Sequence, residues 1–153
     1  MTVTLQPRFD FGTVAPDAEH AISGLDAYVA RSTLEPSLLE LVRLRASQIN
    51  GCAYCIDMHT KDARKRGETE QRLYGLTVWR ETPYYTERER AALAWTEALT
   101  LIAETRAPDD VYEEARKHFD EVELAALTMA VIAINAWNRV AISTRMVPGT
   151  YQP

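Results

Sequence analysis

Residues 50–59 of the chain read NGCAYCIDMH and contain its only two cysteines, Cys52 and Cys55, together with His59, one of three histidines. Asn50-Gly51 is a pair that commonly ends a helix, so the sequence predicts that one helix stops there and another begins near Cys52. On that second helix, offsets of three, four and seven residues place Cys52, Cys55 and His59 on one face. The stretch therefore predicts a pair of helices that carries a dithiol beside a histidine.

The sequence on either side of this stretch predicts helices and almost no alternating strand pattern, so we expect an all-α fold of about six or seven helices. Pro, Gly and capping residues separate segments whose apolar residues recur at helical spacing. The expected helices cover about residues 16–32, 36–50, 52–67, 68–78, 86–104, a short helix from 109, and 120–142. The last of these is apolar almost all round, which indicates a central core helix or a subunit contact.

Length and composition are those of one globular domain, since the 153 residues are 46% hydrophobic and 25% charged. We expect a single domain over 1–153, with an N-terminal arm over 1–15 and a C-terminal arm over 145–153. The net charge of −5, with cations scattered among more numerous acids, argues against a nucleic-acid-binding protein. The N-terminus lacks a secretory signal, and the longest apolar stretch is too short for a membrane helix. A soluble, cytoplasmic protein is expected.

Two cysteines so close together, with no oxidising compartment indicated, are typical of a redox site or a metal site. A helix N-terminus and a Cys-X-X-Cys spacing both favour the thiolate, which is the form that attacks a peroxide. Once one sulfur is oxidised to a sulfenic acid, the other can condense with it to a disulfide. His59, one turn beyond Cys55, can accept the thiol proton or give a proton to the departing oxygen. Cys52 and Cys55 are therefore predicted to turn over a peroxide.

Glu40, on the preceding helix, is predicted to join this site. If Asn50-Gly51 closes an antiparallel hairpin, Glu40 and His59 lie roughly 15 Å and roughly 12 Å from the turn, at about 1.5 Å per residue, and can meet at the same height. Glu40 shares a helix stripe with Leu44 and Ser47, so we expect partly apolar surroundings that could raise the pKa of its carboxyl group and let it transfer protons.

The sequence predicts structural roles for the tryptophans and for the polar residues of the last helix. Trp79, Trp95 and Trp137 are predicted to be core or interface anchors. Asn135, Asn138 and Arg139 interrupt the apolar last helix, and buried polar groups need partners. We expect these three residues to fix helix ends or subunits rather than to contact a substrate.

The spacing of the candidate site residues resembles a known signature. Glu40, eleven intervening residues, the CAYC of residues 52–55 and then His59 resemble the motif of the alkylhydroperoxidase D family, within the carboxymuconolactone decarboxylase superfamily. The segments RASQING (45–51) and INAWNR (134–139) are similar to it as well, so the resemblance covers most of the chain.

This resemblance implies an all-helical fold, reduction of organic hydroperoxides by the dithiol, and a homo-oligomer, either a trimer or a hexamer. It implies that Cys55 is the peroxidatic cysteine, Cys52 the resolving cysteine, and Glu40 with His59 the proton relay. The expected partners are a hydroperoxide substrate and a thiol or lipoyl-type protein reductant, with no cofactor. The family's type member has a further histidine between its cysteines, where this chain has Tyr54, so the relay is shorter here.

Two alternatives remain open from the residues. Cys52, Cys55 and His59 could be three zinc ligands, with Glu40 or His118 as the fourth, although structural zinc sites usually take two ligand pairs from separate segments. The dithiol could also serve as a disulfide oxidoreductase or a redox sensor without efficient peroxide turnover. The decarboxylase branch of the superfamily generally lacks the cysteine pair, so lactone decarboxylation is not expected.

Overall fold

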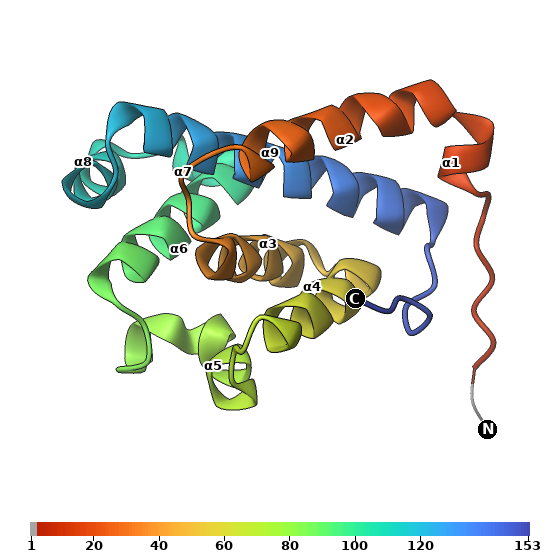
Figure 1. Cartoon of the computed structure of the whole chain (residues 1–153), viewed down its shortest axis with the longest axis horizontal. Helices are drawn as coiled ribbons and strands as arrows, with labels where there is room; N and C mark the ends of the chain where they lie inside the picture. Colours follow the sequence, from red (N-terminus) through yellow and green to blue (C-terminus); the bar gives the residue numbers. More distant parts are fainter. Residues whose placement is uncertain (1–2) are drawn as a thin grey trace.

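The computed structural model describes residues 3–153, and these form an all-helical protein (Figure 1). The all-α prediction is confirmed, but the described residues contain nine α-helices and one 3-10 helix, η1, instead of six or seven helices. In chain order the elements are α1 (Phe11–Val14), α2 (Pro16–Ala30), α3 (Pro36–Asn50), α4 (Ala53–Lys65), α5 (Glu70–Gly75), η1 (Leu76–Glu81), α6 (Glu87–Thr100), α7 (Ile102–Thr105), α8 (Asp109–His118) and α9 (Glu121–Thr144).

Two one-turn helices account for the larger number. α1 lies inside the expected N-terminal arm, where the side chain of Asp10 caps it by accepting a hydrogen bond from Thr13 N at 2.7 Å. α7 is the far end of the helix expected over 86–104, which stops early because the backbone of Leu101 is not helical (φ −99°, ψ 33°). Both are local capping or kink effects that apolar periodicity does not report.

α9 is the central helix of the fold. A capping box of Asp120 and Glu123 opens it, and it packs against α2, α3, α4, α6 and α8. Figure 1 shows α2 running along α9, with α3 and α4 beneath them. By length and hydropathy α9 is a possible membrane span, which differs from the expectation that its apolar stretch is too short, but 44% of its most apolar window is buried inside the chain. Leu127 and Val131, buried to 0% and 1% exposure, belong to the main hydrophobic core. α9 is thus the core helix that the sequence predicted as one of two options.

α3 and α4 form the predicted hairpin. Gly51 ends α3 in the left-handed conformation (φ 71°, ψ 34°), which glycine adopts without the steric cost of a side chain. The next residue, Cys52, donates its backbone N–H to Ser47 O at 2.9 Å and starts α4 as its N-cap. The two helices therefore leave a short, well-defined turn and pack against each other.

Buried amides tie this hairpin to α9. Asn138 is fully buried, donates to Ser47 Oγ at 3.0 Å and accepts from Asn50 Nδ2 at 2.9 Å. Asn50 Nδ2 also lies 3.0 Å from Asn135 Oδ1. The expected structural role of the asparagines in fixing a helix end is confirmed by these contacts, because they hold the C-terminus of α3, and with it the start of α4, against the core.

The C-terminal arm packs on α4 (Figure 1). Residues 145–153 contain no helix, and Tyr151 Oη donates to Asp62 Oδ1 at 2.8 Å. Lys61 Nζ donates to the carbonyl oxygen of Tyr151 at 3.0 Å, and Gly149 N donates to Asp57 Oδ2 at 3.1 Å. Three residues of α4 therefore hold the C-terminal arm against the helix that carries Cys55 and His59.

Candidate redox site on the α3–α4 hairpin

Cys52 and Cys55 lie at the N-terminus of α4 and are joined by a disulfide, with their Cα atoms 5.3 Å apart. Cys52 is the N-cap, and its Sγ accepts a hydrogen bond from Cys55 N at 3.3 Å. Cys55 is in the first turn, where free backbone N–H groups and the helix dipole favour a negative charge after reduction. Both residues are buried, at 1% and 2% exposure. The pair predicted from the spacing is therefore close enough to cycle between dithiol and disulfide.

Glu40 and His59 make the contact that the helix arithmetic predicted. Glu40 Oε2 lies 2.9 Å from His59 Nδ1, and the two residues are buried at 3% and 6% exposure. An ionised carboxylate can only accept hydrogen bonds, so Nδ1 carries a proton, and Nε2 is an acceptor whenever the ring is neutral. Glu40 thus orients the His59 ring from the neighbouring helix, and the neutral ring can take a proton from a thiol at Nε2.

The pKa of Glu40 is lowered, which makes the expected upward shift wrong. Burial is the largest influence and acts to raise this pKa, but the hydrogen bond and charge of His59 and the charges of Arg43 and Arg66 together outweigh burial. Arg43 Nη1 and Arg66 Nε lie 3.2 Å and 3.7 Å from Glu40 Oε1. The lowered pKa keeps Glu40 an ionised carboxylate at neutral pH, in contact with His59.

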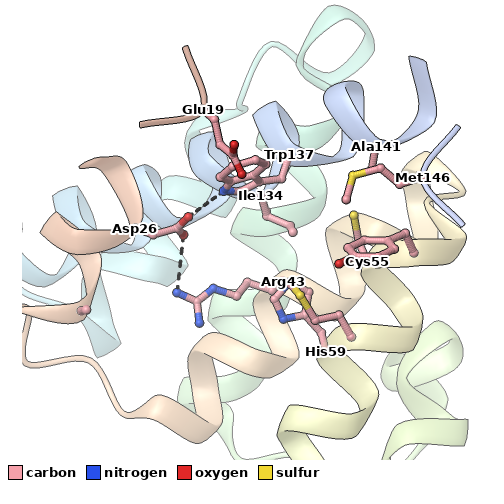
Figure 2. Close-up of a pocket in the computed structure, with 12 residues that line it drawn as sticks. Glu19, Asp26, Arg43, Cys55, His59, Ile134, Trp137, Ala141 and Met146 are labelled. Carbon is pink, nitrogen blue, oxygen red and sulfur yellow. Dashed lines mark hydrogen bonds and ion pairs between the residues drawn. The ribbon is translucent and has the colours of Figure 1, made fainter. Parts of the chain in front are cut away.

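A cavity of about 450 Å³ lies beside this pair (Figure 2). Its walls come from α2, α3, α4 and α9 and from the segment that follows α9. Cys55 and His59 both line it, whereas Cys52 is not among the lining residues. Much of the remaining wall is apolar and consists of Met58, Ile134, Trp137, Ala141 and Met146. The cavity can therefore present an apolar molecule to Cys55.

Polar contacts continue from Glu40 along the cavity wall. Arg43, which pairs with Glu40, also places Nη2 3.8 Å from Asp26 Oδ1, and Asp26 Oδ2 accepts a hydrogen bond from Trp137 Nε1 at 2.6 Å (Figure 2). Asp26 and Arg43 were not predicted from the sequence, and Trp137 was assigned only an anchoring role. The one local signal for Arg43 was its position three residues after Glu40 on the same helix face, where it could pair with that carboxylate.

Of the candidate zinc ligands, the structure brings Glu40 and His59 together, but not with the two cysteines as free ligands. The two cysteine sulfurs are bonded to each other, and His118 lies far along the chain on α8, at the surface beside Glu114. Within residues 3–153, the His, Cys, Asp and Glu side chains close enough to share an ion are Glu40, His59 and Asp62, with ligand atoms within 4.8 Å of one another. Those two carboxylates already accept hydrogen bonds from protein groups. This cluster does not include the predicted ligands Cys52 and Cys55.

Comparison with known proteins places the chain in a family. Residues 16–98, more than half of the chain, match the carboxymuconolactone decarboxylase family. The uncharacterized protein YdfG of Bacillus subtilis (strain 168) is 42% identical over 139 residues, which cover 91% of this chain and 95% of YdfG. The uncharacterized protein YnjA of Escherichia coli (strain K12) is 30% identical over 101 residues, 66% of this chain and 55% of YnjA.

Solved structures agree with this placement. ATU0492 of Agrobacterium tumefaciens, a protein of unknown function with a suggested role as the antioxidant defence protein AhpD, superposes with a TM-score of 0.92 at 46% identity, over 95% of this chain and 100% of ATU0492. The debrominase Bmp8 shares the fold at a TM-score of 0.78 and 19% identity, over 88% of this chain and 73% of Bmp8. The chain therefore belongs to the carboxymuconolactone decarboxylase family, as a member with an AhpD-like fold and a Cys-X-X-Cys pair.

Proposed function

We propose that the protein is a thiol-dependent peroxidase that reduces organic hydroperoxides with Cys52 and Cys55. The single observation that supports this most strongly is that Cys55 opens onto an apolar cavity shared with His59, whose ring is oriented by Glu40. A nucleophile, a base and a pocket for an apolar molecule are thus together. The 46% identical neighbour, with its suggested antioxidant role, supports the same chemistry.

The two cysteines take different roles in this proposal. Cys55 is the peroxidatic cysteine because it lines the cavity with His59, and Cys52, the N-cap behind it, is the resolving cysteine. His59 Nε2 accepts the thiol proton of Cys55, and the thiolate attacks one peroxide oxygen. The S–O bond forms as the O–O bond breaks, and the departing alkoxide takes the proton from His59 and leaves as an alcohol.

Resolution regenerates a stable form of the enzyme. The Cys52 sulfur attacks the sulfenic acid sulfur of Cys55, so an S–S bond forms and the oxygen leaves as water. One hydroperoxide has then become one alcohol and one water, while the dithiol has lost two electrons. A thiol or lipoyl-type protein returns these two electrons, and the enzyme acts in the cytoplasm as a homo-oligomer, trimeric or hexameric.

The test is stopped-flow oxidation of the reduced protein by one equivalent of cumene hydroperoxide, followed by mass spectrometry. Wild type should form the Cys52–Cys55 disulfide stoichiometrically and much faster than a free thiol reacts. Cys52→Ser should accumulate a sulfenic acid at Cys55 that dimedone traps, and Cys55→Ser should react no faster than free cysteine. A trapped sulfenic acid at Cys52 in Cys55→Ser would contradict the assigned roles.

The alternatives give different results in the same preparation. A wild-type rate no faster than that of free cysteine would refute the peroxidase and favour a disulfide oxidoreductase or redox sensor. Zinc retained at one ion per chain by the reduced protein, and lost from Cys52→Ser, would favour a metal site. Metal content is measured before the kinetics, because bound zinc would block thiolate chemistry.

A further inference from the structure

We propose that Asp26 and Glu19 make the cavity selective for uncharged organic hydroperoxides and exclude those that carry a carboxylate. This inference rests on the proposed peroxidase function, because it concerns the substrate of the same site. Both residues belong to α2, and neither is part of the Cys55, His59 and Glu40 machinery. They act as specificity-determining residues at the end of the cavity formed by α2.

The charges that line the cavity are unbalanced. Glu19 and Asp26, seven residues apart on α2, both line it and lie on the same side, near Trp137 (Figure 2). Among the residues that the structure describes, Arg43 is the only Lys or Arg in the lining. Two carboxylates therefore face one guanidinium, and behind Arg43 the negative charge of Glu40 is offset by the positive charge of Arg66. A substrate carboxylate that enters the cavity therefore meets a net negative charge.

Arg43 is not free to bind a substrate carboxylate. Its Nη1 donates to Glu40 Oε1 at 3.2 Å, and its Nη2 lies 3.8 Å from Asp26 Oδ1. Turning Arg43 toward a substrate would take a partner from Glu40, whose side chain is only 4% exposed. Weakening the cationic pairing of a buried carboxylate costs free energy. The cation that could attract an anionic substrate is therefore already used by the protein.

Asp26 is held in place by a second contact. Trp137 Nε1 donates to Asp26 Oδ2 at 2.6 Å, which keeps the carboxylate at the cavity wall and fixes the indole beside it. Ile134 and the Trp137 ring line the wall between Cys55 and these carboxylates (Figure 2), so they offer a path for a molecule whose peroxide group reaches Cys55. An apolar end gains contact with that wall, whereas a carboxylate at the same end is repelled in a partly desolvated space.

The test uses a matched pair of unreactive ligands that differ by one charge. These are 2-phenyl-2-propanol, the alcohol product of cumene hydroperoxide, and 4-(2-hydroxypropan-2-yl)benzoate, its para-carboxylate. Isothermal titration of each into the wild-type protein at neutral pH gives a ratio of dissociation constants. We expect the neutral alcohol to bind at least about tenfold more tightly, a difference that corresponds to about 1.4 kcal/mol.

Three variants connect this ratio to the named residues. Glu19→Gln removes one cavity charge while leaving the contacts of Arg43 in place, and should reduce the ratio by about threefold or more. Asp26→Asn removes one cavity charge and also takes from Arg43 its second carboxylate partner. It should bring the ratio of the two dissociation constants close to one. Asp17→Asn, an exposed residue in the first turn of the same helix, is the control and should leave the ratio unchanged.

The outcomes separate this inference from the proposed function. Equal or tighter binding of the carboxylate by wild type, no measurable binding of either alcohol, or a ratio insensitive to both Glu19→Gln and Asp26→Asn would overturn the selectivity. The two corresponding hydroperoxides are then compared in the oxidation of reduced Cys55. If the binding ratio is as expected but neither hydroperoxide oxidises Cys55, the cavity has the proposed selectivity and the peroxidase function fails.

Discussion

Replacing Glu40 with glutamine tests whether its carboxylate sets the protonation of His59. The substitution keeps the size of the side chain and an oxygen within reach of His59 Nδ1, 2.9 Å away in the wild type, but removes the charge. An amide can donate as well as accept, so the tautomer with a proton on Nδ1 is no longer enforced. The imidazolium that forms when His59 takes the Cys55 proton also loses its counter-charge. We therefore expect slower oxidation of Cys55.

The size of the effect follows from the kind of hydrogen bond that is lost. A hydrogen bond to a charged group contributes about 1.5–3 kcal/mol, and a neutral one about 0.5–1.5 kcal/mol. The difference of about 1–1.5 kcal/mol corresponds to a roughly tenfold slower reaction of Glu40→Gln with cumene hydroperoxide. Because Arg43 and Arg66 lose an anionic partner as well, the free energy of unfolding should fall by about 1–3 kcal/mol.

Glu97→Gln is the matched control. Glu97 lies on α6, does not line the cavity, and its side chain is 13% exposed. The pKa of Glu97 is also lowered. Burial is the largest influence and acts to raise this pKa, but the hydrogen bonds from Trp79 and two arginines together outweigh it. The variant should lose stability to a similar degree and should react with hydroperoxide at the wild-type rate.

The assay combines stopped-flow oxidation of the reduced proteins at neutral pH with unfolding in urea. The rate constant reports on the reaction at Cys55, and the urea midpoint reports on stability. If Glu40→Gln loses stability like Glu97→Gln but is oxidised at the wild-type rate, Glu40 acts only in folding, and it does not control His59.

Acid should destabilise the protein through Glu40. Folding lowers the pKa of Glu40 from 4.5, so the unfolded chain binds the proton first and the free energy of unfolding falls as the pH drops below 4.5. Urea titrations at several pH values should show a smaller loss of stability in Glu40→Gln than in the wild type. Asn138→Leu should cost about 1–3 kcal/mol in the same assay, because Ser47 loses a buried partner. Tyr151→Phe should cost about 0.5–1.5 kcal/mol by removing the hydrogen bond to Asp62. That bond is the main cause that raises the pKa of Tyr151 to about 12. The unfolded chain therefore loses this proton first as the pH rises. The difference in unfolding free energy between wild type and Tyr151→Phe should shrink between pH 10 and pH 12. Unchanged stability in a variant would contradict the corresponding contact.

The hairpin and the central pair of the site could be predicted from the sequence because they depend on local rules. Pro36 and Gly51 mark the ends of α3, and both act through their own backbone geometry. A turn this short fixes the register of two helices, so a rise of about 1.5 Å per residue is enough to bring Glu40 opposite His59. The three-residue spacing of Cys52 and Cys55 likewise fits the pair to one helix turn.

The electrostatics and the cavity were decided only by tertiary structure. Trp137 and Asp26 are 111 residues apart in the chain, and they meet only because α2 packs along α9. The direction of the pKa shift of Glu40 depends on charged neighbours, including Arg66 from the far end of α4, and burial alone predicted the opposite direction. Local patterns determine which face of a helix is apolar, but which charges meet across that face depends on how distant helices pack, because electrostatic interactions act between neighbours in space.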